Sequence, residues 1–130
     1  MKEGPSFEKK TTLCHTKDDI EVNVKYDCYT AITSNRAYRK HTDPGTGRQV
    51  RNLLWRPKLQ EQIEGGIAYV LKHYRWSTIQ TDSSHKQHIE RQIKNCLNEN
   101  FQDEAISLST KGLTVHTVGL IKIVEKPKLY

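Results

Sequence analysis

Residues 20–28 read IEVNVKYDC, in which apolar and polar side chains alternate. This period of two is typical of a β-strand that buries one face and exposes the other to water. The residues before it, Thr16-Lys17-Asp18-Asp19, have the composition of a turn. We therefore expect a hairpin, with a short strand over residues 11–15 followed by a long strand that ends near residue 33.

Two amphipathic helices are predicted in the middle of the chain. Pro57 suits the first turn of a helix, where an N–H group would have no partner. Apolar residues then recur at helical spacing, namely Leu59, Ile63, Ile67, Val70, Leu71 and Tyr74. A second helix is expected from Asp82 or Ser84, because Ser84 and Gln87 fit a capping box. Its apolar stripe consists of Ile89, Ile93, Cys96 and Leu97, with Phe101 at the far end.

Two features interrupt the first helix. Gly65 and Gly66 each cost about 1 kcal/mol relative to Ala in a helix, so we expect a tight packing contact or a weak point there. Residues 76–79 are expected to end this helix, with Ile79 in the core.

A final strand is predicted from Gly112 onwards, ending before Pro127. Its alternation shifts between Val115 and Val118, which indicates a bulge or a strand buried on both faces. Because the strand is apolar, we expect it to be buried and expect partner contacts elsewhere.

Together these elements predict an α+β fold, a small and mostly antiparallel sheet with two helices packed on one face, in the order β-β-α-α-β. A length of 130 residues fits one domain. We expect a flexible leader over residues 1–10, the domain over residues 11–127 with a basic loop at residues 34–56, and a tail at residues 128–130.

The composition indicates the kind of cellular compartment in which the chain is found. The three cysteines are odd in number and form no CxxC pair, which favours a reducing environment over a disulfide framework. No apolar run approaches the ~20 residues that cross a bilayer, and the first ten residues do not resemble a signal peptide. The chain by itself is expected to be soluble, in the cytoplasm or another reducing compartment.

The net charge of +6 is concentrated around the loop at residues 34–56. The cations that could contact an anion, a lipid surface or a partner are Arg36, Arg39, Lys40, Arg48, Arg51, Arg56 and Lys58. Three interpretations stay open. The loop could be a solvated segment whose Arg stems cover apolar surface. It could bind anionic lipid or an acidic protein, or nucleic acid, with Tyr38 and Trp55 stacking on bases.

No catalytic or metal-binding motif stands out. The sequence has no G-x-S-x-G, P-loop or G-x-G-x-x-G motif. His85 and His88 are three apart and could share a metal, but no third ligand lies near them, so we interpret them as surface residues. Cys96 lies on an apolar stripe and is expected to be a core thiol. We expect no enzymatic activity, cofactor, metal or small-molecule substrate.

The sequence resembles the SPFH domain, also called the band 7 or prohibitin-homology domain, of stomatins, prohibitins, flotillins and erlins. Four stretches carry the resemblance: Thr16-Lys17-Asp18 with the alternating strand after it, the helix LQEQIEGGIAYVL at residues 59–71, the link and charged helix at residues 78–97, and the Gly-Leu-x-Val strand that begins at Gly112. Their order and spacing, over roughly residues 12–127, are the evidence.

The resemblance implies a non-enzymatic scaffold in a membrane-associated homo- or hetero-oligomer, which organises membrane microdomains or holds partner proteins. The periplasmic domain of the flagellar FliL protein is similar to such domains, so a stator-ring component is an alternative, as is a basic nucleic-acid-binding domain. Mixed charge on the second helix suits ion pairing between subunits. The residues expected at that interface are Lys86, Glu90, Arg91 and Lys94.

Overall fold

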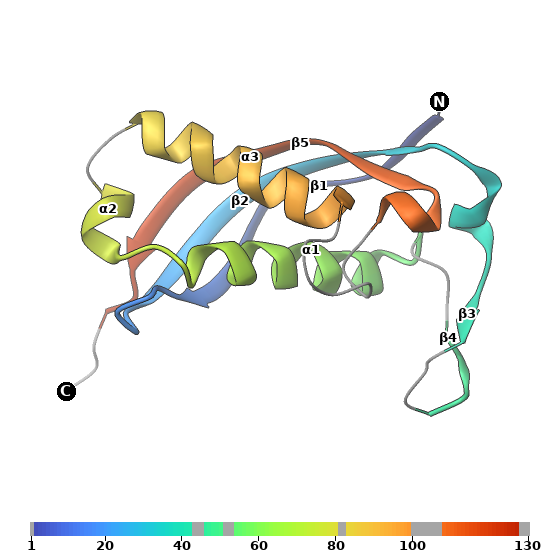
Figure 1. Cartoon of the computed structure of the whole chain (residues 1–130), viewed down its shortest axis with the longest axis horizontal. Coiled ribbons are helices and arrows are strands. Elements are labelled where there is room, and N and C mark those ends of the chain that lie inside the picture. Colours follow the sequence, from blue (N-terminus) through green and yellow to red (C-terminus); the bar gives the residue numbers. More distant parts are fainter. Residues whose placement is uncertain (1, 43–45, 51–53, 81–82, 100–107, 128–130) are drawn as a thin grey trace.

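The computed structural model describes residues 2–42, 46–50, 54–80, 83–99 and 108–127. Its main sheet has three antiparallel strands in the order β1-β2-β5. They are β1 (Lys2–His15), β2 (Glu21–Ile32) and β5 (Leu113–Glu125). Figure 1 shows α1 (Arg56–Leu71) and α3 (Ser83–Glu99) side by side on one face of this sheet. The predicted α+β class and the antiparallel sheet are therefore confirmed.

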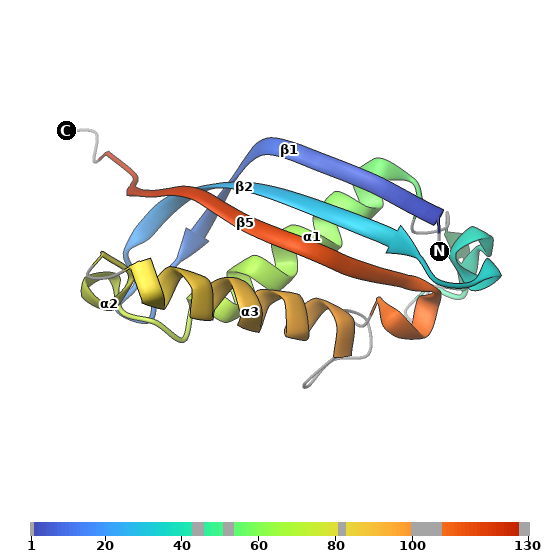
Figure 2. The same ribbon diagram turned by 90° about the horizontal axis from the view of Figure 1, so that it is seen from above.

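The alternation in β2 has the predicted effect. Val22, Val24, Tyr26 and Cys28 are buried toward the helices, while Glu21 and Tyr29 are exposed. β2 is the central strand, and its backbone pairs with β1 along one edge and with β5 along the other. The two faces of the strand therefore differ only in their side chains. No helix of the described part of the chain lies over the other face of the sheet (Figure 2).

The core lies between the sheet and the two long helices. Its largest fully buried side chains are Phe7, Tyr26, Leu59, Ile63, Ile67, Leu71, Ile89, Ile93, Leu97, Leu108 and Leu113. Tyr26 keeps its hydroxyl satisfied by donating to Glu64 Oε2 at 2.8 Å. The apolar stripes predicted for both helices thus form the core, with two exceptions. Tyr74 lies after the end of α1 and is partly buried against the core, and Phe101 lies outside the described residues.

Gly66 explains the interruption in α1. An added Cβ would lie 2.5 Å from Leu97 Cδ2, so the glycine lets α1 and α3 approach closely. Gly65 has nothing within 4 Å of such a Cβ. The expected packing contact is therefore made by Gly66 alone.

Three expectations need correction. Residues 2–10 belong to β1 rather than to a flexible leader. Residues 76–79 do not end the first helix, because α1 stops at Leu71 and a separate short helix, α2 (Trp76–Gln80), follows. The order of the main elements is therefore β-β-α-α-α-β. Ile79 is partly buried and packs against the core.

The segment at residues 34–56 was expected to be a loop, but its described residues include regular elements. It contains a 3-10 helix, η1 (Asn35–Tyr38), and a hairpin of β3 (His41–Thr42) and β4 (Gln49–Val50). Gly112, at the end of η2 (Ser109–Lys111), has a φ of +83° and lies against η1. A Cβ there would be 2.7 Å from the Ala37 nitrogen, which gives a physical reason for glycine at the start of the final strand.

Candidate functional site

The outer edge of β5 is divided into a covered part and an open part. In the covered part, Asn98 of α3 donates from Nδ2 to the Val115 carbonyl at 3.0 Å and accepts the Val115 N–H at 2.6 Å. Farther along, Glu90 Oε2 accepts the Leu120 N–H at 2.6 Å. Side chains of α3 therefore satisfy backbone groups that an edge strand would otherwise offer to another chain.

Beyond Leu120 the strand borders a groove of about 620 Å³. Its other walls are α2 and the first turns of α3. The apolar side chains lining it are Trp76, Ile79, Ile89, Leu120, Ile121, Ile123 and Val124. Lys86, Lys122 and Glu125 supply the charge. This combination of strand edge and apolar walls is suited to receiving a further protein segment.

The open sheet face carries apolar side chains beside this groove. Leu13, Asn23 and Val124 form one row across β1, β2 and β5. Leu13 is 44% exposed and Val124 is 38% exposed, while Ile121 is 42% exposed at a register shift in β5. The final strand was expected to be buried, and that expectation is wrong for its last residues. The buried part ends at Leu120.

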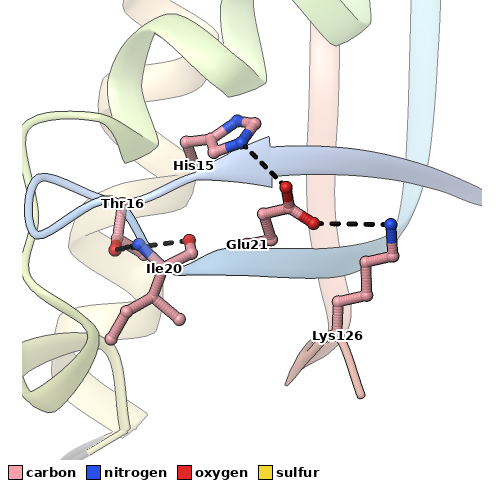
Figure 3. Close-up of polar contacts among 5 residues, drawn as sticks. All are labelled: His15, Thr16, Ile20, Glu21 and Lys126. Carbon is pink, nitrogen blue, oxygen red and sulfur yellow. Dashed lines mark hydrogen bonds and ion pairs between the residues drawn. The ribbon is translucent and has the colours of Figure 1, made fainter. Parts of the chain in front are cut away.

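A polar row closes this end of the sheet. Figure 3 shows Glu21 between His15 and Lys126, with Nε2 of His15 at 3.5 Å and Nζ of Lys126 at 3.4 Å from its two carboxylate oxygens. All three side chains are about half exposed, so solvent screens the pairs and they contribute little stability. They connect residues at the ends of β1 and β2 with Lys126, which follows β5.

The Thr16-Lys17-Asp18 turn fastens the sheet to the link between α1 and α2. The Ile20 N–H donates to Thr16 Oγ1 at 3.1 Å, which closes the turn (Figure 3). The Lys17 N–H donates to the Tyr74 carbonyl at 2.8 Å, and the Trp76 N–H donates to Asp18 Oδ1 at 3.2 Å. The turn therefore fixes Trp76, one wall of the groove.

The first half of β1 has features that discourage pairing with another chain. Pro5 has no N–H to donate, and Lys9 has a φ of +52°. Two register shifts interrupt the pairing with β2, between Glu3 and Ser6 and between Phe7 and Lys10. Proline, lysine and bulges are common protections of an edge strand. The edge of β1 is therefore less suited to pairing than the last residues of β5.

The predicted basic residues separate into two places. Arg36, Arg39 and Lys40 are exposed at η1, and Arg48 is exposed on the β3–β4 hairpin. The other two described cations belong to α1: the guanidinium of Arg56 lies 4.4 Å from the centre of the Phe7 ring, and Lys58 is half-buried. Arg51 lies outside the described residues.

The predicted interface residues of α3 do not share one free face. Lys86 borders the groove at β5, and Glu90 is bound to the backbone of β5. Arg91 is exposed beside a second groove, toward α1. Lys94 is half-buried. Sequence periodicity placed these residues on a charged side of the helix but did not show that β5 lies against part of it.

The three thiols are core groups. Burial raises the pKa of Cys28 to about 12, and burial together with the nearby Glu64 carboxylate raises the pKa of Cys14 to about 12. Burial also raises the pKa of Cys96, as expected from its place on the apolar stripe. Such thiols are poor nucleophiles at neutral pH.

Two further findings concern the described part of the chain. It contains no group of three or more His, Cys, Asp or Glu side chains that could hold a metal ion. None of its helices is both long enough and apolar enough to cross a membrane.

Sequence reasoning missed the groove beside β5. The apolar residues of β5 were recognised, but their exposure depends on which strand pairs with them and where α3 stops covering the edge. The only signal was the second break in alternation at Leu120-Ile121, which matches a register shift against β2.

The chain matches no protein-family model and no curated protein.

Proposed function

We propose that the chain is a non-enzymatic assembly domain of the SPFH type, acting within a membrane-associated homo- or hetero-oligomer that organises membrane microdomains or holds partner proteins. The observation that carries the proposal is the open end of β5. Ile121 and Val124 expose apolar surface there, beside a groove walled by Trp76 and Ile79. Exposed apolar surface next to an unprotected strand edge is typical of a contact between proteins.

The arrangement of the rest of the molecule supports an assembly role. α3 covers the edge of β5 as far as Leu120, and Pro5 and Lys9 interrupt the edge of β1. Unwanted pairing is thus discouraged along the first half of β1 and along β5 as far as Leu120, while the last residues of β5 are left open. The buried thiols offer no reactive nucleophile, which is in keeping with a scaffold.

The test is self-association measured by sedimentation velocity over a range of concentrations. We expect the chain to associate weakly, and Ile121→Lys and Val124→Lys to reduce the association constant roughly tenfold or more, because each brings a charge into an apolar contact. Thr117→Lys is the matched control. It adds the same charge to an exposed position of the same strand, where α3 covers the edge.

The proposal fails if the chain stays monomeric at the highest concentration reached, or if Thr117→Lys weakens association as much as the two test variants. Unfolding curves of all variants show whether each is folded.

One observation favours a second candidate, a nucleic-acid-binding domain. Tyr38 is 48% exposed among Arg36, Arg39 and Lys40, so an aromatic ring lies beside cations, as in many surfaces that bind single strands. Tight, strongly salt-dependent binding to oligonucleotides of unrelated sequence would favour this candidate over the assembly domain.

A further inference from the structure

A second groove, of about 670 Å³, runs between the end of α1 and the middle of α3. Its floor contains Val70 and Cys96, both buried. Tyr69 of α1 and His73, just after the end of that helix, form one wall, with their rings edge to face at 5.2 Å. Among the described residues, none that lines this groove also lines the groove beside β5 or belongs to the basic segment at residues 34–56.

A hydrogen bond joins the two walls, and two further contacts, one within each wall, fix side chains. The Tyr74 hydroxyl donates to Gln92 Oε1, and Gln92 Nε2 lies 3.2 Å from His88 Nε2. His73 Nδ1 lies 2.8 Å from the Tyr69 carbonyl, which fixes its ring. The groove is therefore largely formed before any partner arrives, and binding orders few additional side chains.

The charged side chains considered at this groove, Lys72 beside it and Arg91 on its wall, are both positive. Lys72 Nζ lies 4.5 Å from the centre of the Tyr69 ring, and Arg91 is exposed on the opposite wall. Among the described residues that line the groove, none is Asp or Glu. The groove therefore attracts an acidic partner. Two copies meeting through this face would bring their cations together, which disfavours self-association here.

The walls also favour one secondary structure for the partner segment. One wall is α3, and the other consists of the last turn of α1 with His73 and Tyr74 in the turn after it. Backbone groups within each helix are paired, and in the turn the N–H groups of His73 and Tyr74 donate to the carbonyls of Val70 and Leu71. An extended peptide would find no strand edge and would leave its own N–H and C=O groups unpaired. A helix satisfies those groups internally and can lie along the groove at the usual interaxial distance of about 8–10 Å.

From these observations we infer that the groove between α1 and α3 binds an acidic amphipathic helix of another protein. Apolar side chains of that helix contact Tyr69, Tyr74 and the floor, and its carboxylates contact Lys72 and Arg91. This helix-in-groove mode is independent of the proposed self-association at β5, and it concerns a partner other than a second copy.

The test uses a designed helical peptide with Leu at every third or fourth position and Glu on both flanks, together with a matched peptide that has Lys in place of each Glu. Binding to the whole chain is followed by fluorescence anisotropy and by amide chemical shifts. We expect the Glu peptide to bind and to shift residues 69–74 and 88–96, and the Lys peptide not to bind.

Two charge reversals locate the contact. Arg91→Glu should lower the affinity for the Glu peptide roughly five- to tenfold. The effect is moderate because an ion pair at the rim of the groove is partly screened by solvent. The same variant should bind the Lys peptide more tightly. Arg36→Glu makes the same charge change at η1, at the opposite end of α1 from Lys72, and should leave binding unchanged.

Three outcomes would overturn the inference: no binding of the Glu peptide at about millimolar concentration, equal binding of the two peptides, or shifts confined to η1 and the β3–β4 hairpin. Displacement of the Glu peptide by a single-stranded oligonucleotide, with the same shifts at residues 69–74, would assign the groove to nucleic acid instead.

Discussion

Two adjacent glycines in α1 have opposite surroundings, although the sequence does not distinguish them. Gly65→Ala should raise the free energy of unfolding by up to about 1 kcal/mol, because Ala favours the helix and meets no neighbour. Gly66→Ala should lower it by about 1–3 kcal/mol, because the new methyl group overlaps the fully buried Leu97. Chemical denaturation of both variants measures the difference. Stabilisation by both substitutions would contradict the close contact between α1 and α3.

Asp18 should give the turn a measurable pH dependence. The hydrogen bond from the Thr16 hydroxyl lowers the pKa of Asp18 below its ordinary value, and the Trp76 N–H adds to this. The unfolded chain therefore takes up the proton at a higher pH than the folded chain. The stabilisation is complete above the unfolded pKa of about 3.9 and is lost as pH falls through the lower folded value.

The comparison of wild type with Asp18→Asn tests this. The difference in the free energy of unfolding between the two should be constant near neutral pH and should shrink below about pH 4. Denaturation at a series of pH values measures it. A difference that stays unchanged down to about pH 2 would show that the Asp18 charge contributes nothing to stability.

At the scale of elements, α3 acts as the cover of an edge strand. Asn98→Ala should remove partners from both backbone groups of Val115 and lower the free energy of unfolding by about 1–3 kcal/mol. Hydrogen exchange at the Val115 amide should become faster, because its N–H would lose its acceptor.

Asn95→Ala is the control for that prediction. Asn95 is on the same helix and is half-buried, but it faces the groove toward α1. Its substitution should change stability by no more than about 0.5 kcal/mol and leave exchange at Val115 unchanged. If both variants behave alike, the bonds from Asn98 to the strand edge are not a distinct source of stability.

The elements that sequence reasoning predicted are those with an undisturbed period. β2 alternates without a break and α1 has an apolar stripe over four turns, so β2 and the start of α1 were located correctly, although the end of α1 was placed several residues too late. The start of β1 was missed, because the register shifts around Ser6 and Lys9 destroy the alternation and leave Phe7 as its one buried residue before Cys14. The five residues of α2 are too few to display a helical period.

The surfaces were harder to predict than the elements. Lys86, Glu90 and Lys94 follow one another at a spacing of four, which indicates a shared side of α3. Whether that side meets solvent or another element depends on tertiary packing, and Glu90 in fact accepts a backbone N–H from β5. The exposure of Ile121 likewise follows from the sheet order, which places β5 at an edge.

At the scale of the whole molecule, the cations of η1 and the open end of β5 lie at opposite ends of the long axis. η1 and the β3–β4 hairpin are at one end, and the last residues of β5 are at the other (Figure 1). A domain that contacted an anionic membrane through η1 would keep its open strand available to neighbours. This arrangement suits the proposed role in a membrane-associated oligomer.

Vesicle binding tests this orientation. Replacing Arg36, Arg39 and Lys40 by Ser should reduce co-sedimentation with vesicles of phosphatidylcholine and phosphatidylserine roughly tenfold or more, since each cation near an anionic surface contributes about 1 kcal/mol. Replacing Lys25, Lys122 and Lys126 by Ser removes the same charge from the opposite end and should have little effect. Equal losses would indicate attraction by net charge alone.

The position of β5 in the sheet has a consequence for how the chain comes to be folded in a cell. β1 and β2 are neighbours in sequence and can pair as soon as both have left the ribosome. Val22, however, pairs with Glu125, almost at the other end of the chain. Pairings between distant residues form slowly, and until this one forms β2 is itself an unprotected edge with apolar side chains. While residues 33–112 are being synthesised, the nascent β1–β2 hairpin therefore depends on the helices that follow it, or on a chaperone, to avoid aggregation.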